Sequence, residues 1–163
     1  MIRILALLAP LWLLSATPAD ALLCHALLGC SCTVTTPDIK FDDLVPLGGA
    51  THDTQGTVNV DCTGILDVAP SMLVRIDKGT WGTIPARKMR SPAGDLLNYS
   101  LYTTNSYGTV WGDGVTGAIV SITGGLLVSG HWTVSRTIFA RVAPTTNQPP
   151  GTYTDTLVVR IDW

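Results

Sequence analysis

The chain contains no glutamate, and charged residues make up only 13% of its 163 residues. Its formal net charge is −2. Nucleic-acid-binding domains usually carry a basic patch, so the near-neutral charge argues against that function class. Residues that favour helices are scarce, whereas threonine, valine, glycine and proline are abundant. This composition predicts an all-β protein.

No segment beyond the N-terminus is apolar and long enough to span a membrane. The N-terminus has a short basic start at Met1–Arg3, an apolar run at Ile4–Leu14, and a small, polar stretch ending in Ala-Asp-Ala at Ala21. That order is typical of a secretory signal with an A-x-A cleavage site. We therefore expect an exported protein with a signal peptide at 1–21, a short cysteine-containing segment at 22–31 and one domain at 32–163.

Four cysteines follow the predicted signal: Cys24, Cys30, Cys32 and Cys62. Export makes disulfides the expected state. Four cysteines allow three pairings, and the sequence does not choose among them. The spacing lacks the paired C-x-x-C arms of a zinc site, so no metal is expected. A lipoprotein attachment box ending at Cys30 is an alternative, but Leu28 fits such a box poorly.

Short stretches of alternating residues recur after Cys32, with glycine- and proline-rich turns between them. Period-two alternation is typical of half-buried strands. Seven or so strands at this spacing predict a β-sandwich. The predicted strands lie at 32–35, 57–62, 71–77, 97–101, 115–122 and 133–142, and in the stretch that follows Gly151.

The C-terminal stretch alternates without a break as far as Trp163. Leu157, Val159, Ile161 and Trp163 share one face, and the residues between them share the other. The sequence ends while this strand is still running. A sheet that ends on an apolar strand with nothing after it to pair invites a strand from another chain.

Three groups of segments, in this order and spacing, resemble the spore coat protein U domain. That family supplies subunits of archaic (Csu-type) chaperone–usher pili. The resemblance covers roughly Cys32 to Trp163. Its segments are Cys32–Val34 with Val58–Gly64, then Arg87–Met89 with Leu97–Tyr102 and Val110–Gly114, and finally Phe139–Pro144 with Pro150–Leu157.

The resemblance implies an immunoglobulin-like β-sandwich that lacks its final strand and is completed by donor-strand complementation. A periplasmic chaperone would lend the missing strand first, and another pilus subunit would replace it at the outer-membrane usher. The family's disulfide maps to Cys32 and Cys62. Leu157, Val159 and Ile161 would then help to floor the groove for the donor strand, on the face that Trp163 shares. The implied role is surface attachment and biofilm formation from a cell-surface pilus.

The N-terminal segment departs from the family pattern. Leu22–Ser31 is apolar but does not alternate, and it contains two cysteines. A polymerising subunit needs an alternating donor arm before its domain. The chain is thus expected to accept a strand but not to donate one, which suits a tip or minor subunit. Family tip adhesins usually carry two such domains, and this chain has one.

The sequence also indicates which aromatic side chains are buried and which are exposed. Tyr99, Tyr102, Trp111 and Trp132 are expected to pack in the core or at sheet edges. Trp111 also opens a Trp-Gly-Asp-Gly stretch, which predicts a turn. Trp81 lies in a glycine-flanked loop, so it is either an exposed adhesive contact or a side chain tucked onto the sandwich.

Candidate catalytic residues are sparse. The three histidines are scattered and no nucleophile signature accompanies them, so no enzymatic activity and no cofactor are expected. The basic residues Arg75, Arg87, Lys88 and Arg90 are expected to form a solvated or salt-bridged face. The alternative function is a stand-alone secreted sandwich that binds a carbohydrate or another surface ligand and folds without a partner.

Overall fold

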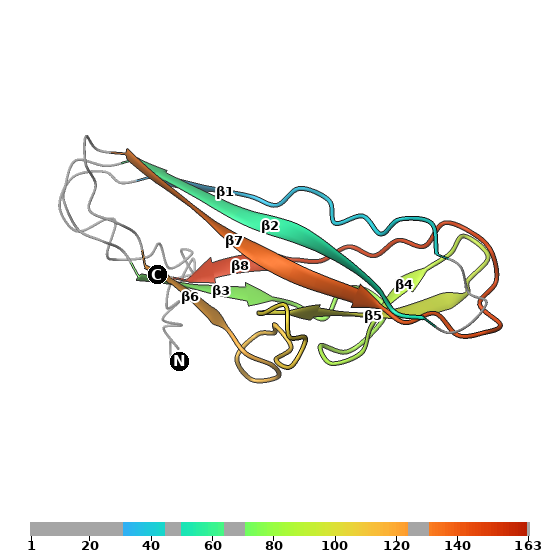
Figure 1. The fold of residues 1–163 in the computed structure, drawn as a ribbon. Coiled ribbons are helices and arrows are strands. Elements are labelled where there is room, and N and C mark those ends of the chain that lie inside the picture. Colours follow the sequence, from blue (N-terminus) through green and yellow to red (C-terminus); the bar gives the residue numbers. More distant parts are fainter. Residues whose placement is uncertain (1–30, 45–49, 64–70, 124–130, 163) are drawn as a thin grey trace, which may run out of the picture.

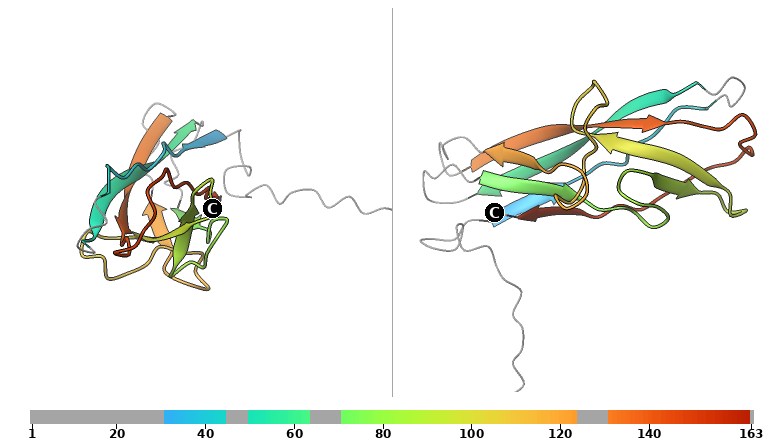
Figure 2. Two further views of the ribbon diagram at one scale, coloured as in Figure 1. Left: turned by 90° about the vertical axis from the view of Figure 1, so that its right-hand side faces the viewer. Right: turned by 90° about the horizontal axis from the view of Figure 1, so that it is seen from below.

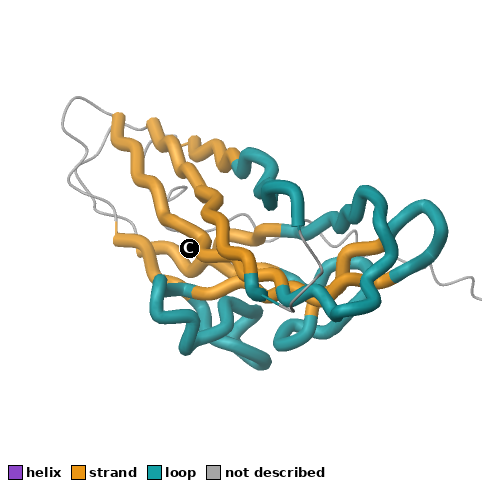
Figure 3. The backbone as a smooth tube through the Cα atoms, turned by 45° about the vertical axis from the view of Figure 1, so that its right-hand side comes forward, coloured by secondary structure: helices purple, strands orange, loops and turns teal. Residues whose placement is uncertain are grey.

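A computed structural model describes residues 31–44, 50–63, 71–123 and 131–162. These residues form eight strands and, within the described ranges, no helix (Figure 3). No described segment is a helix that could cross a membrane. The predicted signal peptide, Cys24, Cys30 and Trp163 lie outside the described residues. The strands are β1 (Ser31–Thr35), β2 (His52–Thr63), β3 (Ser71–Ile76), β4 (Arg87–Arg90), β5 (Leu96–Tyr102), β6 (Val120–Thr123), β7 (His131–Val142) and β8 (Val159–Asp162).

The strands form two sheets that face each other (Figure 1). The large sheet has the order β1-β2-β7-β5-β4, and the small sheet has the order β6-β3-β8. All pairs between named strands are antiparallel. The long strands β2 and β7 pair over their whole length, from His52 opposite Val142 to Thr63 opposite His131. The predicted β-sandwich is confirmed.

The core lies between the sheets and is built by the period-two alternation. Alternate side chains of β3 and β5, and of parts of β2 and β7, point inward and are almost fully buried. The outward side chains between them are mostly polar, which explains why alternation was the visible signal. The core residues include Val58, Val60 and Cys62 of β2, Met72, Val74 and Ile76 of β3, Leu97, Tyr99 and Leu101 of β5, and Ile138, Ala140 and Val142 of β7.

Two predicted strands are shorter than the alternation suggested. The strand predicted at 115–122 is β6, which begins only at Val120, and Val115 is 94% exposed. The Asp113 carboxylate accepts hydrogen bonds from the backbone N–H groups of Val115 and Thr116, which holds this stretch in a turn. The last strand, β8, begins at Val159, although half-buried and exposed residues already alternate before it.

Candidate strand-acceptor groove

Each sheet ends on the same open side of the sandwich. Strand β1 is an edge of the large sheet and β8 is an edge of the small sheet. Both run along one side of the molecule (Figure 2). No strand among the described residues pairs with the outer edge of either one. Unpaired edges present a row of free N–H and C=O groups, which is a template for another strand.

A groove of about 950 Å³ opens on this side. Two chain segments form its walls: Thr36–Leu44, which continues from β1, and Gln148–Val159, which leads into β8. Apart from the start of β8 at Val159 and an isolated bridge at Thr154, neither wall belongs to a β-ladder. The floor consists of core side chains from both sheets: Ile76, Met89, Leu97, Tyr99, Leu101 and Ile138.

The predicted groove residues are only partly brought together. Leu157 and Val159 line the groove, and both are half-buried against the core. Ile161 packs against the same core but does not line the groove. It pairs with Val74 inside the small sheet. Trp163 lies outside the described residues.

Sequence reasoning missed the first wall. Ile39, Phe41 and Leu44 pack half-buried against the core. Ile39 and Phe41 have the spacing of a strand face, but Pro37 indicated only the end of the preceding strand. Gly56 of β2 makes room for this wall, because a Cβ atom there would lie 2.4 Å from Cγ1 of Ile39.

A disulfide ties the edge strand β1 to its neighbour. Cys32 and Cys62 are bonded and occupy directly paired positions of β1 and β2. The pairing implied by the resemblance is confirmed. Among the described residues there is no free cysteine and no cluster of histidine, cysteine and acidic residues that could hold a metal.

The model of the Spore Coat Protein U domain family matches residues 19–160. The chain belongs to this family.

A solved structure shows the same fold at low sequence identity. The complex of CsuC with the tip adhesion subunit CsuE, from the archaic chaperone–usher Csu pili of Acinetobacter baumannii, matches with a TM-score of 0.52 and 19% identity. The match covers 82% of this chain and 40% of the solved chain. A chaperone–tip adhesin complex of CFA/I fimbriae gives a TM-score of 0.45 and 13% identity, over 79% of this chain and 41% of that one. A search of curated protein sequences found no match.

These results establish the immunoglobulin-like sandwich of the Spore Coat Protein U domain for this chain. The chain spans about two fifths of the length of the solved chains it matches.

A polar anchor holds the second wall of the groove in place. The hydroxyl of Tyr99 donates a hydrogen bond to Oδ2 of Asp155 at 2.7 Å. The backbone N–H groups of Thr80 and Thr156 donate to Oδ1 of the same carboxylate, each at 2.9 Å. Burial, together with the bond to Asp155, raises the pKa of Tyr99 well above its ordinary value, so its hydroxyl stays a donor. The anchor holds the wall before β8 against the large sheet.

Arg87 is buried, which corrects the prediction that it belongs to a solvated face. Its side chain has no exposed surface. It donates hydrogen bonds to four backbone carbonyls: those of Ile76, Asp77, Ile84 and Trp111, at 2.8–3.2 Å. Burial lowers the pKa of Arg87. The guanidinium thereby joins β3 to the loop that follows it and to the loop between β5 and β6.

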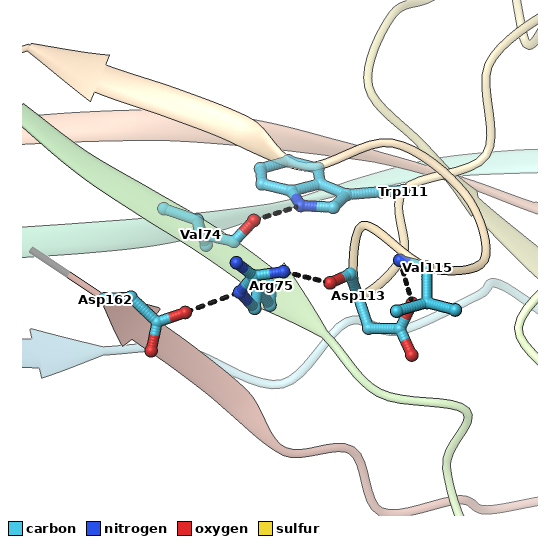
Figure 4. A network of polar contacts seen from close by, with 6 residues as sticks. All are labelled: Val74, Arg75, Trp111, Asp113, Val115 and Asp162. Atoms are coloured by element: carbon cyan, nitrogen blue, oxygen red, sulfur yellow. Dashed lines mark hydrogen bonds and ion pairs between the residues drawn. The ribbon is translucent and has the colours of Figure 1, made fainter.

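Arg75 fits the salt-bridge prediction. It pairs with Asp162 of β8 and donates to the backbone carbonyl of Asp113 (Figure 4). In the same view, the indole N–H of the fully buried Trp111 donates to the carbonyl of Val74 at 3.0 Å. The turn predicted after Trp111 is confirmed, because Asp113 caps it and Gly114 has a φ of +88°. These backbone bonds lower the pKa of Asp113.

Trp81 is partly exposed and partly packed onto the sandwich, so it lies between the two predicted positions. Its side chain is 43% exposed, and the guanidinium carbon of Arg90 lies 4.4 Å from its ring centre. The contact is a cation–π interaction, which holds one side of the ring against β4. The remaining surface of the ring faces solvent, so an adhesive role stays a prediction.

Proposed function

We propose that this chain is a structural subunit of an archaic chaperone–usher pilus whose groove accepts a donor strand. The observation that carries the proposal is the groove of about 950 Å³ between two walls, next to two sheet edges that no described strand pairs with. The similarity of fold to a chain of the CsuC–CsuE chaperone–tip subunit complex supports it. The alternative of a closed, stand-alone binding sandwich does not explain why the core is open on this side.

The physics of the proposed step is β-augmentation. An incoming strand would hydrogen-bond to both walls and place every second side chain on the apolar floor. Each large apolar side chain buried in this way contributes about 1.5–3 kcal/mol. The ladder gives affinity for any extended segment, whereas the fit of the buried side chains gives specificity.

The proposed partners follow from this step. After export, a periplasmic chaperone would supply the first strand, and another subunit would replace it at the outer-membrane usher. The finished pilus would lie on the cell surface and serve attachment and biofilm formation. A terminal or minor position is proposed because Leu22–Ser31 lacks the alternation of a donor arm.

The test is periplasmic expression of the chain alone and together with an archaic-pilus chaperone, followed by size-exclusion chromatography. We expect a stable 1:1 complex with the chaperone and aggregation of the chain alone, because an open core and free edges associate. A soluble, cooperatively folded monomer that ignores the chaperone would overturn the proposal. Long homopolymers in the same chromatogram would contradict the terminal position only.

We further propose that the exposed side of Trp81 contributes to attachment. Trp81→Ala is expected to reduce attachment to an apolar surface several-fold, because a large aromatic ring carries much of the contact energy in such interfaces. Trp81→Phe keeps an aromatic face over Arg90 and should retain most of the attachment. Attachment is measured at matched pilus density. Unchanged attachment with Trp81→Ala would contradict the adhesive role and leave Trp81 with a structural role in its loop.

A further inference from the structure

The acceptor groove has a strong excess of one sign of charge. Asp38, Asp42 and Asp43 lie on its first wall, and Asp155 lies on its second. We call these four residues the acidic rim. Among the described residues that line the groove, Lys40 is the only cation. The lining therefore carries a formal charge of −4 + 1 = −3.

The carboxylates of the first wall are not paired with a cation of the described residues. Asp38, Asp42 and Asp43 are exposed, and none of them forms a salt bridge with a described residue. Asp155 differs, because it already accepts hydrogen bonds from Tyr99, Thr80 and Thr156. The first wall thus presents three negative charges beside an apolar cleft. Unpaired rim charges of this kind select a partner of the opposite sign.

We propose that the donor strand which fits this groove is basic as well as alternating, with lysine or arginine between its apolar residues. This inference rests on the proposed strand-acceptor function. In such a strand the apolar side chains point to the floor of the groove, and the intervening side chains point outward. The outward cations would then lie near Asp38, Asp42 and Asp43. An acidic strand of the same apolar pattern would meet like charges and bind more slowly.

The occupant is therefore a segment of a different chain. The N-terminal segment Leu22–Ser31 contains no lysine or arginine and does not alternate. A second copy of this protein offers neither property through that segment. Charge complementarity points instead to a basic extended segment on the chaperone or on another subunit.

The experiment compares three synthetic twelve-residue peptides that share one alternating valine–leucine pattern. Their intervening positions carry lysine, serine or aspartate. The chain recovered from the periplasm is diluted from denaturant into each peptide, and the rate of complex formation is followed by tryptophan fluorescence at low and high salt. We expect the lysine peptide to associate about tenfold faster than the serine peptide at low salt, and the aspartate peptide to be slowest. The difference should shrink at high salt.

A variant links this effect to the rim. In the triple variant Asp38→Asn/Asp42→Asn/Asp43→Asn the side chains keep their size but lose their negative charge. The lysine peptide should therefore associate only as fast as the serine peptide. Asp42→Asn alone should slow it about two- to threefold. The matched control for this single variant is Asp61→Asn. Asp61 of β2 is half-exposed, pairs with His131 and does not line the groove, so its loss of charge should leave the association rate unchanged.

The outcomes separate the two proposals. If all three peptides associate at equal rates, the acceptor function stands and the preference for a basic donor is overturned. If none of the three associates, the acceptor function itself fails, and the preference fails with it. If the lysine peptide remains fastest on the triple variant, the selectivity does not come from the acidic rim.

Discussion

Replacing Arg87 with alanine is expected to lower the free energy of unfolding of the strand-complemented domain by about 3–5 kcal/mol. The four carbonyls that its guanidinium binds are those of Ile76, Asp77, Ile84 and Trp111. Without it they would be left unpaired in a buried site, and each such group costs roughly 1–3 kcal/mol. Water entering the space left by the side chain would recover part of this loss. Urea denaturation of the complemented domain measures the change.

The matched control is Arg90→Ala on the same strand, β4. Arg90 is exposed, and its guanidinium stacks on Trp81. Its backbone hydrogen bonds to Thr154 are kept in the alanine variant. Its removal is expected to cost about 0.5–1 kcal/mol. Arg87→Lys keeps the charge but has a single ammonium group, which cannot reach four carbonyls in a plane. It should therefore fall between wild type and Arg87→Ala. Equal stability of Arg87→Ala and Arg90→Ala would show that the carbonyl network does not stabilise the fold.

Removing the disulfide with Cys32→Ser/Cys62→Ser is expected to destabilise the domain by about 3–4 kcal/mol in the chain-entropy model. The bond closes a loop with a sequence separation of 30 residues. It holds β1 against β2, which is its one strand neighbour in the part of the chain that the structure describes. Because Thr36–Leu44 continues from β1, loss of the bond should also loosen the first wall of the groove.

Two measurements check this prediction. The urea midpoint of the complemented domain reports the stability, and the yield of chaperone complex in the periplasm reports the state of the groove. The single variants Cys32→Ser and Cys62→Ser control for the serine substitutions, since each removes the same bond. They should lose as much stability as the double variant. A double variant as stable as wild type would contradict the expected role of the bond.

The alternation of residues predicted most of the sandwich because it depends only on neighbours along the chain. β2, β3, β5 and β7 were all visible in this way. β4 was not, because Arg87, Lys88 and Arg90 give it a charged appearance. The start of β8 was placed too early, since an alternating pattern shows which face is buried but not whether a neighbouring strand is present to pair with it.

The sequence by itself determined the all-β class, the inward and outward faces of the strands, and the family. These depend on residue type and short spacing, and the match to the family model over residues 19–160 rests on the same information. The tertiary structure confirmed that Cys32 pairs with Cys62, which the resemblance had implied. It alone decided that Arg87 is buried and that Thr36–Leu44 faces Gln148–Val159 across a groove. Each of these depends on which distant segments meet when the sheets close, and local patterns carry no information about that meeting.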